Sequence, residues 1–327
     1  MQINSKEKII DYFKKGIKKD ELIGVENEKF LFEKSSNLRA DYKKIKQVLE
    51  KFQNKFNWQA IKEGPNTIGL KSGEKSISLE PGNQIELAGE KLKNIHEVCS
   101  ESYIFQDQLK EICNEDDLKI LSVGYDPISR LEDVPNNPKQ RYKLMTLKMP
   151  KNGELSLDMM YKTSGTQINL DYLSEKDFIK KFKIISFLTP LTIAIFANSS
   201  LKENKPSGYL SYRAKVWQKT SRGGLPKIFL ENMNFEKYAD YTINSPLLFT
   251  IFNNGYISPN KKTFKDFMVG GIKEMNNKLP DTKDLEIHLS TIFTEVRLKS
   301  YLEIRSLDAC EWDCHCAGPA FFTGLLY

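Results

Sequence analysis

Charged residues two positions apart recur in segments whose composition is typical of β-strands. Glu26 and Glu28 lie in GVENEKF, Glu86 lies in QIELAG, and Glu303 and Arg305 lie in YLEIRS. Side chains two residues apart on a strand point to the same face, and partly buried carboxylate pairs favour a cation between them. Oxygen ligands without His or Cys nearby suit Mg²⁺ or Mn²⁺. The pattern predicts a metal site at Glu26, Glu28, Glu86 and Glu303, although any single pair is also typical of a solvated strand.

Arginine is rare in this chain, which makes each one a candidate for ligand binding. It occurs at only seven positions, whereas Lys and Arg together number 49. A guanidinium binds carboxylate or phosphate through two parallel hydrogen bonds, a geometry that Lys cannot reproduce. The chain has neither a Walker A motif nor a Rossmann glycine pattern. We therefore expect any nucleotide to bind at the metal-rich sheet face, with Arg305 beside its phosphates.

Hydrophobic periodicity and turn residues predict the elements that position these groups. Helices are expected at 5–19, 41–56, 90–115 and, mostly buried, 174–198; strands are expected at 22–32, as three short strands within 67–89, and at 118–123, 166–171, 295–298 and 301–305. The segment 126–139 reads as a loop, and 199–265 resists assignment. Helices that interleave with short, turn-linked strands predict one α+β domain on a mainly antiparallel sheet.

The composition excludes several classes of protein. The chain has 327 residues, of which 40% are hydrophobic and 28% are charged, so it is neither disordered nor fibrous. Its net charge of +6 suits an anionic ligand or a nucleic acid. The N-terminus has no apolar signal-peptide core, and the longest apolar stretch, 184–197, is too short to span a bilayer. Five cysteines, an odd number, do not indicate a secreted disulfide framework. These features predict a cytoplasmic protein that does not enter a membrane.

The segment CEWDCHC holds Cys310, Cys314, His315 and Cys316 and raises the question of zinc. Its C-x₃-C-x-C spacing differs from that of a zinc knuckle, and no second ligand pair follows. We therefore expect a cluster of reduced thiols here rather than a zinc site.

Ten segments in order along the chain make it similar to a known family. The chain resembles the plant and proteobacterial type of glutamate–cysteine ligase, which catalyses the first step of glutathione synthesis. The segments are IGVENEKF (23–30), ISLEPGNQIELAGEKLKNIHEVCSE (77–101), RYKLM (141–145), MPKNGELSLDMM (149–160), TQINLDYLSE (166–175), PLTIAIFANSS (190–200), GYLSYRAKVW (208–217), FKDFM (264–268), HLSTIFTEVRLKSYLEIRSLD (288–308) and CAGPAFFTGLLY (316–327).

The resemblance implies a glutamine-synthetase-like fold in which an antiparallel sheet, surrounded by helices, lines an ATP and metal funnel. It implies an ATP-dependent carbon–nitrogen ligase whose co-substrate is ATP, whose cofactor is Mg²⁺ or Mn²⁺, and whose substrates are glutamate and cysteine. ATP would phosphorylate the γ-carboxylate of glutamate, and the amine of cysteine would then displace phosphate. No nucleic acid or membrane partner is implied.

The resemblance also implies roles for individual residues. Arg305 and Glu303 would be the catalytic residues. The metal would be bound by Glu26, Glu28, Glu86 and Glu303. The residues expected to bind substrate are Arg141, Arg213, Trp217, Gln167 and Asn169. The segment 218–226 is shorter than is usual in the family, so its loop is the least certain part of the site.

The resemblance further implies that residues 1–327 form a single catalytic domain that lacks the C-terminal helical region of the family. Two alternatives remain at this point. A related carboxylate–amine ligase would use another amine in place of cysteine, and a basic nucleic-acid-binding protein would use the +6 charge. The carboxylate cluster argues against the second alternative, because an acidic face repels a phosphate backbone.

Overall fold

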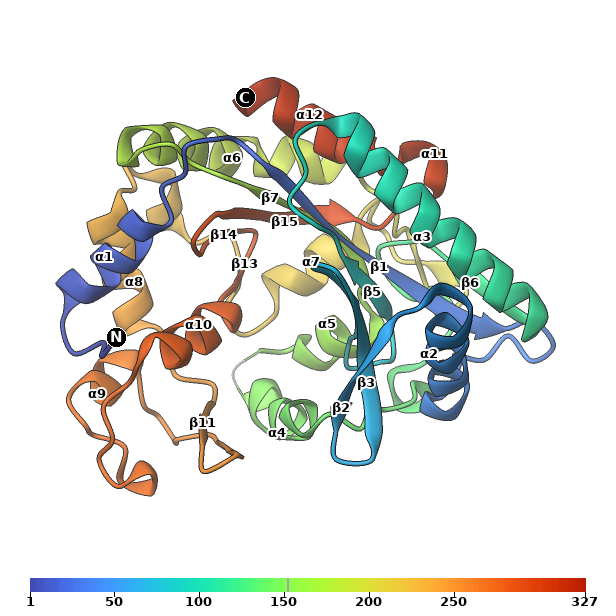
Figure 1. Cartoon of the computed structure of the whole chain (residues 1–327), viewed down its shortest axis with the longest axis horizontal. Helices are drawn as coiled ribbons and strands as arrows, with labels where there is room; N and C mark the ends of the chain where they lie inside the picture. The colour runs from blue at the N-terminus through green and yellow to red at the C-terminus, as the bar shows by residue number, and fades with distance from the viewer. Residues whose placement is uncertain (152) are drawn as a thin grey trace.

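A nine-stranded sheet runs through the computed structural model, which describes residues 1–151 and 153–327 apart from the side chains of residues 312 and 313 (Figure 1). The strand order is β14-β15-β7-β1-β5-β4-β3-β2, β6 also pairs with β1, and each pair is antiparallel. The strands are β1 (Ile23–Glu33), β2 (Gln59–Glu63), β3 (Asn66–Ser72), β4 (Lys75–Leu79), β5 (Ile85–Ala88), β6 (Leu118–Leu121), β7 (Gly165–Leu170), β14 (Val296–Leu298) and β15 (Leu302–Asp308).

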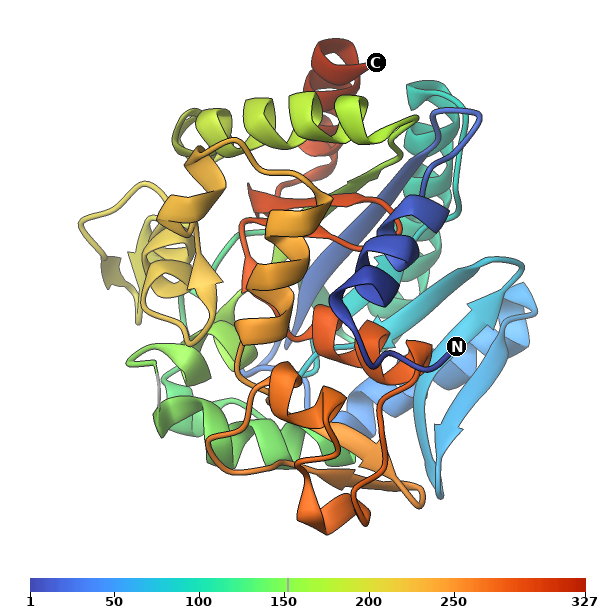
Figure 2. The same ribbon diagram turned by 90° about the vertical axis from the view of Figure 1, so that its left-hand side faces the viewer.

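Helices flank both sides of this sheet. In Figure 1, α3, α6 and α12 lie along one side, and α4, α5, α7 and α10 lie on the other; Figure 2 shows α1, α8 and α10 in front of the sheet. The helices are α1 (Lys6–Lys15), α2 (Tyr42–Phe56), α3 (Ile95–Glu115), α4 (Gln140–Lys148), α5 (Ser156–Lys162), α6 (Glu175–Ile195), α7 (Tyr212–Gln218), α8 (Phe235–Asn244), α9 (Phe264–Met268), α10 (Thr282–Ser290), α11 (Trp312–His315) and α12 (Ala317–Leu326). The predicted α+β fold with a mainly antiparallel sheet is confirmed.

Short elements occupy the segment that resisted assignment from sequence. Three two-stranded pieces are formed by β8 (Leu201–Lys202) with β9 (Lys205–Pro206), β10 (Gly223–Gly224) with β13 (Phe293–Thr294), and β11 (Thr250–Phe252) with β12 (Gly255–Ile257). Helix α9 has only five residues and depends on a reciprocal cap between Thr263 and Asp266. Elements this short are below the window in which periodicity is informative.

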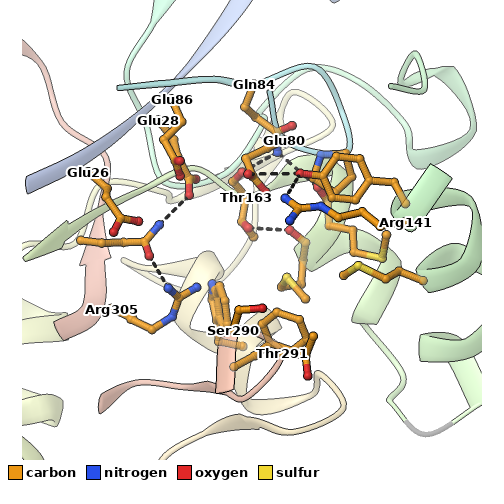
Figure 3. Close-up of a pocket in the computed structure, with 18 of the residues that line it drawn as sticks. Glu26, Glu28, Glu80, Gln84, Glu86, Arg141, Thr163, Ser290, Thr291 and Arg305 are labelled. Atoms are coloured by element: carbon orange, nitrogen blue, oxygen red, sulfur yellow. Dashed lines mark hydrogen bonds between the residues drawn. The ribbon is translucent and has the colours of Figure 1, made fainter. Parts of the chain in front are cut away.

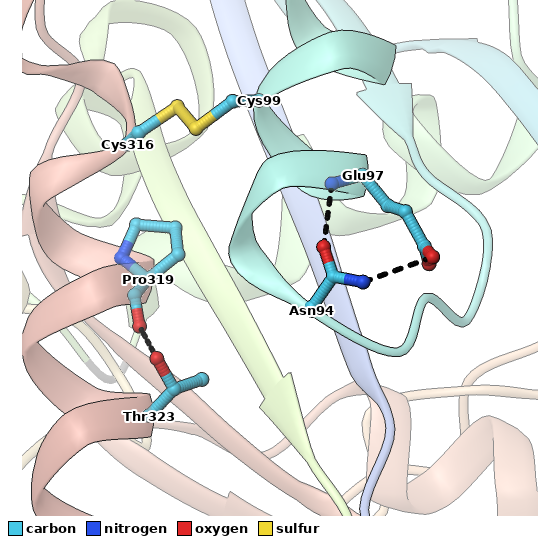
Figure 4. The surroundings of a disulfide bond; sticks show 6 residues. All are labelled: Asn94, Glu97, Cys99, Cys316, Pro319 and Thr323. Carbon is cyan, nitrogen blue, oxygen red and sulfur yellow. Dashed lines mark hydrogen bonds between the residues drawn. A yellow bond between two sulfur atoms is a disulfide. The ribbon is translucent and has the colours of Figure 1, made fainter.

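Helix α3 begins at Ile95 rather than at the predicted Glu90. The Asn94 side chain accepts the N–H of Glu97 at 3.0 Å, and the Asn94 amide donates to the Glu97 carboxylate at 3.0 Å (Figure 4). This cap satisfies N–H groups that the first turn leaves unpaired, so the helix starts there.

Helix α6 is less buried than predicted. Phe178, Phe182 and Ile185 belong to the main core, but the Phe187 and Leu191 side chains are 54% and 50% exposed. The apolar residues of the segment 184–197 therefore extend beyond the buried face of the helix. Among the described residues, no helix has the length and apolarity needed to cross a membrane.

A disulfide joins Cys99 on α3 to Cys316, which precedes α12 (Figure 4). The prediction of reduced thiols is therefore wrong for Cys316. The two cysteines are 217 residues apart in sequence, and they meet because α3 and α12 both contact β1 on the same side of the sheet. No local spacing rule reports such a pairing.

The alternation of β1 separates the core from the site. Val25 packs in the main core with Val98 of α3 and Phe322 of α12. Because successive side chains of a strand point to opposite faces, Glu26 and Glu28 point away from these helices. The sheet thus buries one face against α3 and α12 and turns its acidic residues toward α5, α7 and α10.

Candidate active site

A cavity of about 190 Å³ lies against the acidic face of the sheet (Figure 3). Its walls come from the sheet, from the turn before β5, and from helices α4, α5, α7 and α10 with the segments beside them. Its lining includes Glu26, Glu28, Glu80, Gln84, Glu86, Arg141, Tyr142, Gln167, Trp217, Thr291, Arg297 and Arg305.

Four carboxylates form one wall of the cavity. Glu28 and Glu86 face each other across β1 and β5, and Glu26 lies two residues away on β1. Burial, and then the nearby Glu80, raise the pKa of Glu28 to about 7 and that of Glu86 well above its usual value. A cation close to Glu28 and Glu86 would favour the charged form of both carboxylates. Glu80 was missed from sequence because it lies in the EPGN turn rather than on a strand.

Two amides hold the acidic wall in place. Gln167 on β7 donates to Glu28 at 2.9 Å, and Asn169 donates to Glu26 at 2.8 Å. Both were expected to point into the cavity, but only Gln167 lines it. In this arrangement the amides orient the carboxylates: Asn169 binds one oxygen of Glu26, and Gln167 binds one oxygen of Glu28, whose other oxygen accepts the backbone N–H of Gly165 at 2.8 Å.

Glu303 lies behind the wall rather than in the cavity lining. Its side chain is fully buried, and it accepts hydrogen bonds from Arg297 at 2.6 and 2.8 Å, with the Lys299 ammonium 3.0 Å away and Arg305 also bound. Burial alone would raise its pKa, yet Arg297, Lys299 and Arg305 together hold that pKa well below the usual range. Glu303 is therefore an anion that anchors three cations.

Arg305 and Trp217 connect this anchor to the cavity. The Arg305 guanidinium binds Gln167 and Glu303 and lies 5.3 Å from the centre of the Trp217 ring. Arg213 lies 5.2 Å from the same ring centre and donates to the backbone oxygen of Arg305 at 2.8 Å. Arg213 is buried and does not line the cavity, so it supports Arg305 and Trp217 from behind.

Arg141 faces the acidic wall from α4 (Figure 3). It donates to the Tyr142 hydroxyl at 2.7 Å, and that hydroxyl donates to the backbone oxygen of Leu79 at 2.9 Å. Within the described residues, the buried Nε of Arg141, the Nε of Arg305 and the indole N–H of Trp217 have no hydrogen-bond partner. Such buried donors are normally paired, and a bound anion would pair them.

The segment 218–226, whose loop departs from the family pattern, contacts the cavity lining at Thr291. Arg222 adopts a positive φ of 66° and donates to the Thr291 hydroxyl at 3.0 Å. Strand β10, from Gly223 to Gly224, then pairs with β13. The short loop is thus tied to the cavity lining.

The fold and the cavity together define an α+β protein whose sheet carries four carboxylates on one face, with guanidinium groups opposite them. The chain belongs to glutamate–cysteine ligase family 2, whose family model matches residues 22–327. This confirms the family expected from the sequence.

Two plant relatives illustrate the similarity. The chain is 44% identical to glutamate–cysteine ligase B of rice (Oryza sativa subsp. japonica) and 43% identical to the ligase of Arabidopsis thaliana, each over 99% of this chain. It spans 66% and 63% of their lengths. Both relatives are chloroplastic, a finding that contradicts the predicted cytoplasmic location.

The fold is similar to that of a solved structure, the glutamate–cysteine ligase of Francisella tularensis in complex with AMP. The TM-score is 0.50 at 13% identity, with 95% of this chain and 67% of that chain covered. At this identity the likeness supports the fold.

Proposed function

We propose that this chain joins the γ-carboxylate of glutamate to the amine of cysteine at the expense of ATP, the first step of glutathione synthesis. The observation that carries the proposal is a cavity with four carboxylates on one wall and guanidinium groups facing them. The family and the names of the plant relatives give the reaction, and the AMP complex of the Francisella enzyme is consistent with nucleotide use.

The acidic wall fits Mg²⁺ or Mn²⁺. Its donors are all carboxylate oxygens, and the raised pKa values of Glu28 and Glu86 reflect a charge that a cation would relieve. Among the described residues, no group of three or more Asp, Glu, His or Cys side chains is placed so that it could hold a metal ion by itself. Mg²⁺ does not need such a group, because it takes one or two carboxylates and completes its shell with water and substrate phosphates. The proposed ligands are drawn from Glu26, Glu28, Glu80 and Glu86, and the ion would neutralise phosphate charge.

One arginine would bind the glutamate substrate, and another would act on the phosphates of the nucleotide. Arg141 would bind the α-carboxylate of glutamate through its unpaired N–H. Arg305, held by Gln167 and Glu303, would stabilise the phosphoryl group as it moves from ATP to the γ-carboxylate. The cysteine amine would then attack the γ-glutamyl phosphate and release phosphate.

The role of Glu303 differs from that of the wall. As a metal ligand it would have to release Arg297, Lys299 and Arg305, whose combined charge it balances in a fully buried position. We propose instead that it positions Arg305. Trp217 would contribute in the same way through its stacking with Arg305, and Arg213 through its contact with Trp217 and its hydrogen bond to the Arg305 backbone. Asn169 would contribute through Glu26.

The test is ADP formation that requires both glutamate and cysteine. Glu28→Gln is expected to abolish it. Glu33→Gln, at the other end of β1, is the matched control and should retain it, because the Glu33 carboxylate accepts the Ser36 hydroxyl at 3.1 Å and does not line the cavity. ADP formation that persists in Glu28→Gln would contradict the site. A panel of other amines separates cysteine from other acceptors, because turnover with glutamate and another amine alone would favour a different carboxylate–amine ligase.

A further inference from the structure

A second cavity, of about 250 Å³, lies on the opposite side of β7 and β15 from the acidic site. Thr166 lines this cavity, while Gln167, the next residue of β7, lines the first one. The two cavities share no lining residue. Cys310 and Cys314 both line the second cavity.

These two cysteines are free and adjacent. Cys310 is half-buried just before α11, and Cys314 is exposed on that helix. The Cys314 thiol donates to the backbone oxygen of Glu311 at 3.4 Å. Burial, and then the neighbouring Cys314 thiol, raise the pKa of Cys310 to about 12. Both cysteines, four residues apart in sequence, line the wall of one cavity.

A buried cation lies beneath the thiol pair. Lys29 of β1 is 3% exposed, and its ammonium donates to the backbone oxygen of Cys310 at 3.1 Å. In the described part of the chain, no carboxylate lies within ion-pair distance of it. Cys310, Glu311 and Cys314 are the groups that oppose the desolvation of this ammonium. An unpaired buried charge costs free energy, so a negative charge at the two sulfurs would be favourable here.

We propose that Cys310 and Cys314 form a two-coordinate site for a soft, thiophilic metal ion of the monovalent copper class. Thiolates select soft ions. A structural zinc site needs four ligands, whereas at this cavity the described residues include no group of three or more side chains placed to hold a metal ion. Binding replaces two S–H bonds by two S–Cu bonds and releases two protons, without any change of oxidation state. The resulting anion, of net charge −1, would lie next to the Lys29 ammonium.

The test is an anaerobic competition titration of the full chain with Cu(I) held by the chromogenic chelator bicinchoninate. No thiol reductant is present, so that Cys99–Cys316 stays closed. The chain should withdraw one equivalent of Cu(I), and uptake should strengthen as pH rises because the thiols lose protons on binding. Cys310→Ser and Cys314→Ser should each weaken uptake at least tenfold, while Cys113→Ser, which removes the other free thiol, should not.

A second measurement guards against variants that misfold. In the unmodified chain, bound Cu(I) should protect Cys310 and Cys314 from alkylation, as read by peptide mass spectrometry. The proposal is overturned by any of three results: no uptake, full uptake by Cys310→Ser or Cys314→Ser, or alkylation of both thiols in the copper-loaded chain.

Discussion

A buried ion pair between Arg39 and Asp126 supports the turn that carries part of the acidic wall. The two side chains are 1% and 0% exposed, and the guanidinium lies 3.0 Å from the carboxylate. Arg39 also binds the backbone oxygen of Gly82, within the turn that begins at Glu80, and lies 4.4 Å from the centre of the Phe30 ring. We predict that Arg39→Met destabilises the chain severely.

The magnitude follows from what the substitution leaves behind. Removing one partner of a buried pair leaves an uncompensated charge and typically costs about 3–5 kcal/mol. Asp126 would keep the N–H groups of Ile128 and Ser129, each at 2.9 Å, which limits the loss. Against a total stability of about 5–15 kcal/mol, we expect Arg39→Met to remove about 3 kcal/mol or more. Asp126→Asn in the same background should restore part of it, because no buried charge then remains.

Urea denaturation followed by circular dichroism measures both effects. Burial raises the pKa of Asp126, but Arg39 and the N–H donors outweigh burial and lower it below the usual value. The stabilisation is therefore present above the unfolded pKa, about 3.9, and is lost as pH falls through the lower folded pKa. A loss below about 1 kcal/mol in Arg39→Met, or strictly additive effects in the double variant, would refute the reasoning.

Three further predictions concern the site and the cross-link. Glu86→Gln should raise the Mg²⁺ concentration needed for half-maximal ADP formation at least tenfold, and an unchanged requirement would remove Glu86 from the metal site. Arg141→Lys should raise the KM for glutamate about tenfold or more with a smaller change in kcat, since Lys lacks the bidentate geometry; an unaltered KM would contradict the role. Cys99→Ser should lower the free energy of unfolding under non-reducing conditions by about 2–5 kcal/mol, whereas Cys113→Ser, a control without a disulfide, should not show this loss.

The sequence predicted the acidic wall because strand periodicity is a local property. Glu26 and Glu28 are two residues apart on β1, so their shared face follows from the pleat alone, and both line the cavity. Glu80 escaped because the turn that carries it has no periodicity. The segments of the family resemblance supplied the expected site residues, but they did not indicate which of these residues line the cavity and which lie behind its wall.

The contacts of the Glu303 side chain could not be predicted from the sequence pattern. The two-residue spacing correctly placed Arg305 on the same face of β15 as Glu303. The partner strand β14 places Arg297 directly opposite Glu303, and the turn between the strands brings Lys299 within 3.0 Å. These contacts depend on a hairpin register, and they are the reason why we propose a positioning role for Glu303 in place of the metal-ligand role expected from the sequence.

The strand order also dictates when the site can assemble during synthesis. Strands β1 to β6 come from residues 23–121, so the acidic wall can form from the first part of the chain. Strand β15, which brings Arg305, follows β7 in the sheet but is made about 180 residues after β6, a delay on the order of 10–40 s at typical translation rates. Throughout that interval the wall has no arginine from β15 to balance it, so a nascent chain would hold its carboxylates protonated or gather cations from solution.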